Sequence, residues 1–358
     1  MKSRFYQIDF IRTAAFLMIF VSHITRLNHH DNGLGCGGVS LFMILSGFLM
    51  FYNHGDEIDG KVSVSGLWRA GVGYYKKGLG KFYKGHIITF VSGALLQAYW
   101  LIRWFSVEGF WGAVQTAVPN ILLFQSFIPK GEYYFSYNAV SWFLCDILFF
   151  YFCFPFLAQM IKRQKIFLGG GTAAAVVLLY VLFAGMAGGF PEQKWLLYIC
   201  PLVRLADFGL GMVLCAQFKD RLAETKEGNR GKKRGTLLQI GSIVLMAVLV
   251  IGYPYVPEAL SYGIIYILPS MLCIYSFLCY DTKLARLFAH KFWHTISMVS
   301  MEAYLVHQMV IRYLDEYSRE MQYISGPLYL VMICTGTAVS ALYLRFLCGK
   351  WHGQTSRL

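Results

Sequence analysis

Long apolar runs alternate with short polar segments along this chain. Ten runs approach the ~20 residues that a helix needs to cross the hydrocarbon core of a bilayer. They predict spans at 7–25, 38–53, 85–105, 139–161, 166–187, 195–218, 236–253, 260–280, 296–314 and 327–347. The pattern therefore predicts an all-α polytopic integral membrane protein with about ten transmembrane helices.

One further apolar stretch, 109–128, is interrupted or flanked by Glu108, Pro119 and Gln125. We expect an interfacial or re-entrant helix here rather than a full crossing. A full crossing would invert the topology of every later segment.

The composition supports a membrane protein. Of 358 residues, 57% are hydrophobic and 14% are charged, whereas soluble domains carry about 25% charged residues. A formal net charge of +13 is also found in nucleic-acid-binding proteins, but here the cations lie between apolar runs and form no contiguous basic face. We expect one transmembrane domain over residues 1–358, with no appended soluble domain and no nucleic-acid partner.

The cations predict the orientation. With ten spans and a cytoplasmic N-terminus, 24 of the 32 Lys and Arg residues fall on the cytoplasmic side, as the positive-inside rule requires. Both termini should therefore be cytoplasmic. The first run is similar to a signal peptide, but Asp9 and Arg12 lie at its edge and no small-residue cleavage site follows, so it is retained as the first span.

Two cytoplasmic segments are rich in Lys and Arg. The predicted loop 61–84 intersperses Lys76, Lys77 and Lys81 among glycines, and glycine-rich backbone with lysine can hold phosphates, although the pattern is not a P-loop. The hydrophilic segment 223–235 is typical of a solvated loop whose cations face anionic lipid.

Three ionisable residues on the first span are costly in a bilayer and need an explanation. Arg12 and His23 are eleven residues apart, about three helical turns, and so share one face about 16 Å apart. Arg12 stays charged and suits a phosphate or carboxylate, whereas a neutral His23 suits proton abstraction from a hydroxyl. Asp9 precedes Arg12 by three residues, which allows an ion pair.

Other spans also carry polar residues. Arg204 and Asp207 repeat the three-residue spacing, Tyr304 and His307 share a helix face, and Trp142 precedes Asp146 by four residues. Ionisable residues inside a membrane face a bundle interior or a cavity by default, so these spans should line one polar interior. For Trp142, simple packing at the external interface explains the residue equally well.

Several chemistries are disfavoured. The nine Cys residues are scattered without a C-x-x-C pair and read as small buried hydrophobes. His29, His30 and Asp31 lack a further ligand at suitable spacing, so no metal is expected. Ser46 lacks the Gly-x-Ser-x-Gly context of a nucleophile, and Ser-Gly pairs usually serve close helix packing.

Taken together, five motifs resemble the membrane acyltransferase-3 family, the O-acetyltransferases that decorate bacterial cell-surface polysaccharides. The matching segments are Asp9-x-x-Arg12-x(10)-His23, Leu41 to Leu49 with Ser46-Gly47-Phe48, Trp142-Phe143-Leu144, Arg204-x-x-Asp207-Phe208-x-x-Gly211-Met212, and Tyr304-Leu305-x-His307. They occur in the family's order over nearly the whole chain. One segment departs: where the family is similar to K-K-R-x-x-R-x-x-P, this chain has Gly78 in place of an Arg and Lys84 in place of the Pro.

The resemblance implies transfer of an acyl group, most simply acetyl, from cytoplasmic acetyl-CoA as cosubstrate to a hydroxyl of a glycan or glycolipid at the outer face of a bacterial cell membrane. It implies a catalytic group of His23, His307, Tyr304 and Asp9, with His23 as general base or transient acyl carrier. Donor-binding residues would be Arg12, Lys76, Lys77, Lys81 and Arg204. Ser46, Trp142 and Asp207 would contact the acceptor.

A different class of function also explains buried Arg, His and Asp residues, namely a transporter or flippase that uses them as a substrate or proton path. A non-catalytic scaffold for polysaccharide synthesis would leave the charged spans unexplained. The sequence leaves open the acceptor, the length of the acyl group, a covalent intermediate or direct transfer, and a monomer or homodimer.

Overall fold

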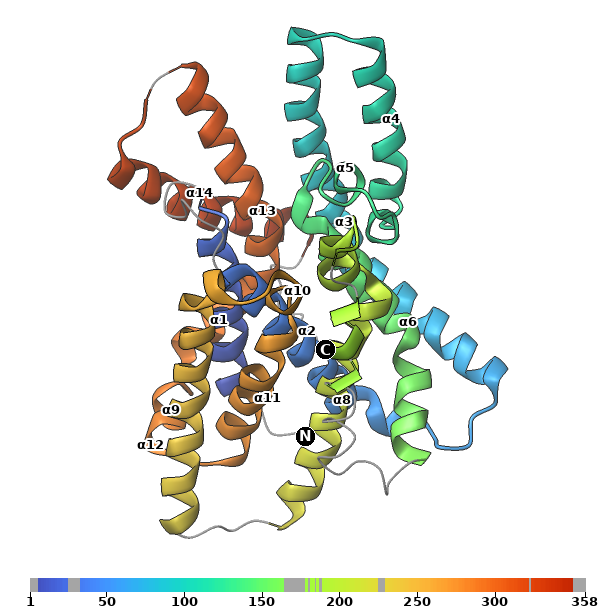
Figure 1. Ribbon diagram of the computed structural model, residues 1–358, viewed down its shortest axis with the longest axis vertical. Helices are drawn as coiled ribbons and strands as arrows, with labels where there is room; N and C mark the ends of the chain where they lie inside the picture. Colours follow the sequence, from blue (N-terminus) through green and yellow to red (C-terminus); the bar gives the residue numbers. More distant parts are fainter. Residues whose placement is uncertain are drawn as a thin grey trace.

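All regular secondary structure in the part of the chain that the structure describes is helical, which confirms the all-α prediction. This computed structural model describes residues 6–24, 33–163, 178–179, 181–183, 185–186, 189–224, 229–321 and 323–349 (Figure 1). The α-helices are α1 (Tyr6–Ser22), α2 (Leu34–His54), α3 (Val64–Arg103), α4 (Val107–Ile121), α5 (Gly131–Tyr134), α6 (Trp142–Arg163), α8 (Pro201–Glu224), α9 (Asn229–Ile251), α10 (Glu258–Ser261), α11 (Ile264–Cys279), α12 (Lys283–Leu287), α13 (Lys291–Glu320) and α14 (Gly326–Leu347). Short 3-10 or π turns lie at Gly55–Glu57, Gln125–Phe127, Ala139–Ser141, Trp195–Ile199 and Tyr253–Tyr255.

Seven helical segments among the described residues are long and apolar enough to cross a membrane: Leu34–Glu57, Val64–Arg103, Ala139–Arg163, Trp195–Lys219, Gly231–Ile251, Glu258–Cys279 and Gly326–Leu347. Each contains or overlaps one predicted span. The predicted span 7–25 corresponds to α1, of 17 residues, and 296–314 lies within the longer and more polar α13. The predicted span 166–187 lies mostly outside the described residues, so the count of ten stays a prediction.

The prediction of a loop at 61–84 is wrong, because α3 is a continuous helix from Val64. Its glycines do not loosen the chain but allow close packing on α6. A Cβ on Gly71 would lie 2.5 Å from the Phe152 carbonyl oxygen, and one on Gly78 would lie 2.7 Å from the Tyr151 ring. Glycines seven residues apart fall on the same helix face, as in the small-residue interfaces of membrane helices.

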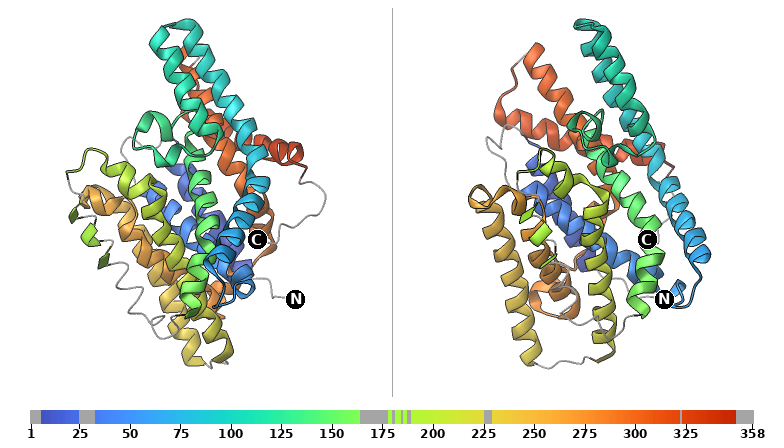
Figure 2. Two further views of the ribbon diagram at one scale, coloured as in Figure 1. Left: turned by 90° about the vertical axis from the view of Figure 1, so that its right-hand side faces the viewer. Right: turned by 45° about the vertical axis from the view of Figure 1, so that its right-hand side comes forward.

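The stretch predicted as interfacial or re-entrant forms α4, which has 15 residues and does not meet the length of a crossing helix. Together with the second half of α3 it forms a hairpin that projects from one end of the molecule (Figures 1 and 2). His86 of α3 ties the base of this hairpin, since its Nε2 lies 2.9 Å from the Asn120 carbonyl oxygen. The second half of α3 and α4 therefore form an antiparallel pair.

Helix α1 packs between α2 and α13 and runs parallel to α13. Three side-chain contacts fix this register: Asp9 with His294, Arg12 with Ser297, and His23 with His307. The last two join residues 285 and 284 positions apart, a nearly constant offset that only parallel helices give. Polar residues at both ends of α1 therefore meet polar residues of α13.

Helices α2 and α8 cross at very short range in the centre of the bundle. A Cβ on Gly47 would lie 1.9 Å from the Phe208 carbonyl oxygen, and one on Gly211 would lie 1.9 Å from the Ile44 carbonyl oxygen. Only glycine fits both positions. The Ser46-Gly47 pair thus serves the close helix packing that its sequence suggested.

Helices α6 and α8 run parallel, since Trp142 stacks near Tyr198 at one end and Phe150 contacts Phe208 further along. The central helices α2, α6 and α8 each bury 67% of their most apolar window, against 17% for α9 and 22% for α14. Arg204 and Asp207 sit on one of these enclosed helices, α8.

Candidate functional site

Two histidines face each other where α1 ends against α13. His307 Nε2 lies 3.2 Å from His23 Nδ1, and the ring centroids are 5.0 Å apart. His307 is fully buried, with Phe16 and Phe20 at its edges, whereas His23 is partly exposed. His23 is therefore the more accessible residue of the pair.

Backbone carbonyls determine which nitrogen of each ring carries the proton. His307 Nδ1 lies 2.7 Å from the Tyr304 carbonyl oxygen, and His23 Nδ1 lies 2.8 Å from that of Ile19. Because a carbonyl only accepts hydrogen bonds, each Nδ1 is the donor. His307 Nε2 then accepts from His23 Nδ1–H, and His23 Nε2 keeps its lone pair, which is the state of a general base.

Tyr304 lies beside this pair, with its ring 5.7 Å from that of His307. Its hydroxyl donates to the Val140 carbonyl oxygen at 3.0 Å. The phenol therefore holds the 137–141 segment in place and does not donate to either histidine. Asn138 Nδ2 donates to the Leu305 carbonyl oxygen, and Gln308 accepts from the Val140 amide. The segment before α6 is thus fixed against the face of α13 next to the histidines.

Arg12 lies toward the opposite end of α1, where its Nη1 approaches Ser297 Oγ at 3.4 Å. It is partly exposed and close enough to Tyr151 of α6 for an electrostatic interaction. Eleven residues of helix separate it from His23, about 16 Å along the axis. Both side chains contact α13, so Arg12 and His23 share one face of α1, as their spacing predicted.

Asp9 has a partner that sequence reasoning missed. Its Oδ2 lies 3.2 Å from His294 Nδ1 on α13. The sequence does carry a signal, since Asp9 and Arg12 on α1 and His294 and Ser297 on α13 share the same three-residue spacing. Only the helix register, however, shows that the two pairs meet.

Lys76, Lys77 and Lys81 project from α3 rather than from a loop. Lys76 and Lys77 are exposed, and Lys81 is partly exposed. Lys77 Nζ lies 5.4 Å from the centre of the Tyr74 ring, and Lys81 Nζ lies 5.2 Å from that of Phe82. Their helix packs on α6 through Gly78 and Tyr151, the residue that Arg12 approaches, so these cations lie toward the Arg12 end.

Arg204 and Asp207 form the ion pair that their spacing allows, at 2.9 Å, with both side chains fully buried. Arg204 also donates to Ser40 at 3.1 Å. Gly263 lies so close that an added Cβ would be 2.1 Å from the guanidinium. The pair is enclosed by α2, α8 and the start of α11, and neither side chain has exposed surface. The predicted contacts of Arg204 with the donor and of Asp207 with the acceptor stay predictions.

The remaining predicted residues are also internal. Trp142 is buried with its ring 5.2 Å from that of Tyr198. Ser46 donates to the Phe42 carbonyl oxygen of its own helix at 2.7 Å. Asp146 is fully buried near Arg204. No contact joins these three to the histidine pair in the described part of the chain, and the roles of Trp142 and Ser46 toward an acceptor stay predictions.

No group of three or more His, Cys, Asp and Glu residues suitable for a metal ion occurs among the described residues. His29, His30 and Asp31 lie outside the described residues.

The sequence of this chain is similar to that of a known acyltransferase. The acyltransferase MdmB of Streptomyces mycarofaciens is 26% identical over 326 residues, which covers 85% of this chain and 78% of that protein. No solved structure matches this chain significantly. The profile of the acyltransferase domain of the acyltransferase-3 family matches residues 5–345. The chain therefore belongs to the acyltransferase-3 family.

Proposed function

We propose that this protein transfers an acyl group, most simply acetyl, from cytoplasmic acyl-CoA to a hydroxyl of a glycan or glycolipid at the outer face of a bacterial cell membrane. The observation that carries the proposal is the state of His23: its Nδ1–H is engaged by Ile19 and His307, so its Nε2 offers a lone pair at a partly exposed position.

The distribution of cations supports this orientation. Lys162 and Arg163 at the end of α6, Lys219 on α8, and Lys77 on α3 all lie toward the Arg12 end of the bundle. The positive-inside rule assigns such an end to the cytoplasm. Arg12 would then meet a cytoplasmic nucleotide, and His23 would lie in the outer half of the membrane.

The chemistry follows from this placement. His23 Nε2 takes the proton of the acceptor hydroxyl as the oxygen attacks the thioester carbonyl carbon. The carbon–sulfur bond breaks, an ester forms, and the imidazolium returns the proton to the leaving thiolate, which departs as CoA. His307 keeps the His23 ring in the tautomer whose Nε2 can act as base, since it accepts the Nδ1–H.

The distance between the two ends also fits. Arg12 suits the phosphates of a CoA molecule because a guanidinium is planar and always charged. About 16 Å of helix separates it from His23, so a donor with its phosphates at Arg12 needs an extended arm to bring its thioester to the base. A route along one face of α1 would carry the acyl group across the membrane.

Sealed vesicles that contain the protein test this function. Acetyl-CoA labelled in its acetyl group is supplied on one side, and label is sought on glycan, lipid and protein. We expect ester-linked label on a glycan or glycolipid with the wild type and none with His23→Ala. Movement of an unmodified substrate without any transferred label would overturn the proposal in favour of a transporter.

A further inference from the structure

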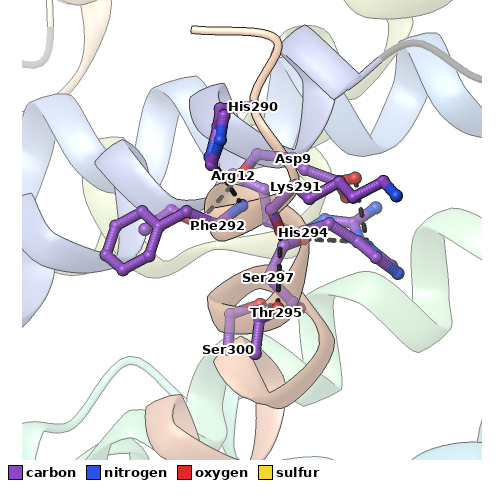
Figure 3. A network of polar contacts seen from close by, with 10 residues as sticks. Asp9, Arg12, His290, Lys291, Phe292, His294, Thr295, Ser297 and Ser300 are labelled. Carbon is purple, nitrogen blue, oxygen red and sulfur yellow. Dashed lines mark hydrogen bonds and ion pairs between the residues drawn. The ribbon is translucent and has the colours of Figure 1, made fainter.

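Two polar contacts join α1 and α13 near Arg12, and they lie next to each other along the two helices (Figure 3). Asp9 Oδ2 lies 3.2 Å from His294 Nδ1, and Arg12 Nη1 lies 3.4 Å from Ser297 Oγ. The partners are three residues apart on both helices, so Arg12 and His294 lie on neighbouring positions of one interface. A single ligand at this interface could contact both.

Asp9 and His294, which form the first of these contacts, differ in exposure. The Asp9 side chain is 9% exposed and the His294 side chain is 22% exposed. The carboxylate is the less exposed of the two and lies at the Nδ1 edge of the imidazole. A carboxylate in contact with a histidine fixes the orientation of the ring.

The surroundings favour an anion. Arg12 is partly exposed, and Lys291 is exposed one turn before His294. On the other side of α13, Arg345 lies 3.9 Å from the buried carboxylate of Glu302 and donates to the Met298 carbonyl oxygen. Glu302 therefore has a cation of its own, and the interface around Arg12 and His294 carries an excess of positive charge.

We propose that His294 is a donor-binding residue, which contacts the phosphate groups of the acyl donor together with Arg12, while Asp9 positions its imidazole. This inference rests on the proposed use of acyl-CoA. It adds a residue of α13 next to Arg12 of α1, so the donor contacts the same two helices that hold the histidine pair at the far end.

Binding to the purified full-length protein in lipid nanodiscs tests the inference. Calorimetry with CoA and with pantetheine compares a ligand that carries phosphates with one that shares only its thiol arm. In His294→Ala, CoA should bind about tenfold more weakly, the usual contribution of one charge-assisted hydrogen bond. Pantetheine binding should not change. His294→Lys should retain most of the CoA affinity, because it keeps a nitrogen donor at the site.

Two controls separate a donor contact from a general loss of structure. Thr295→Ala changes the exposed neighbouring residue and should bind both ligands as the wild type does. The thermal unfolding midpoint of each variant reports folding. Equal weakening of CoA and pantetheine in His294→Ala, or unchanged CoA binding, would overturn the role of His294. If the wild type itself binds no CoA, the proposed donor is wrong as well.

Discussion

The histidine pair and the Arg204–Asp207 pair look alike by distance but differ in access. Both bring two polar side chains together inside an apolar bundle, at 3.2 Å for His23 and His307 and at 2.9 Å for Arg204 and Asp207. His23 is partly exposed, whereas Arg204 and Asp207 have no exposed surface. We therefore expect the first pair to act on a substrate and the second to act mainly on the fold.

This difference refines the rule that ionisable residues in membrane helices mark functional sites. Arg204 is an ionisable residue of this kind, but Gly263, Ser40 and Asp207 enclose its guanidinium, so we expect its main effect to be on the fold. A buried pair of this kind contributes little stability compared with an apolar replacement, yet its disruption is costly. Substitutions in the histidine pair should therefore lower acyl transfer, and substitutions in the Arg204–Asp207 pair should lower stability.

The largest effect on activity is expected for His23→Ala. Loss of a general base lowers the rate by about 10²–10⁴-fold, while the thermal unfolding midpoint should stay near that of the wild type. Acyl transfer by variants in vesicles measures this. Ser22→Ala is the matched control, since Ser22 donates to the same Ile19 carbonyl oxygen at 2.7 Å and should retain activity. Normal acyl transfer by His23→Ala would show that the histidine pair is not the active pair of the two.

Arg204→Met should instead act on stability. It leaves the Asp207 carboxylate buried without its cation, which costs about 3–5 kcal/mol. The double variant Arg204→Met with Asp207→Leu should recover most of that loss, because no charge is then left alone. Unfolding in detergent measures both variants. A stable Arg204→Met protein that cannot bind CoA would place Arg204 in the donor site, as the family resemblance implied.

A smaller loss is expected for His307→Asn. Residue 307 is buried and acts on the substrate only through His23, so removal of its ring should lower kcat about tenfold, the effect of one hydrogen bond. KM for the donor should not change. The double variant with His23→Ala should be no slower than His23→Ala alone, because the two histidines act as one unit. Additive losses would show an independent role for His307.

Local patterns in the sequence predicted more of the fold than of the site. Apolar run length predicted the crossing helices, and the eleven-residue spacing placed Arg12 and His23 on one face. The continuity of α3 was missed because glycine breaks most helices in water, whereas in a membrane bundle Gly71 and Gly78 allow close packing. The partners His294 and His307 were not identified as contacts, because they depend on the register of α1 and α13.

Ser46 is partly exposed, unlike Arg204 and Asp207, and does not contact the histidine pair in the described part of the chain. Its substitution should have the smallest effect. Its hydroxyl donates to the Phe42 carbonyl oxygen within α2, a bond that adds little to helix stability. We expect Ser46→Ala to change stability by less than about 0.5 kcal/mol and to leave acyl transfer unaltered. Gly47→Ala, one residue further, should instead separate α2 from α8, because its methyl group would meet the Phe208 carbonyl oxygen. Lost transfer in a stable Ser46→Ala protein would move this residue from the enclosed class to the acceptor site.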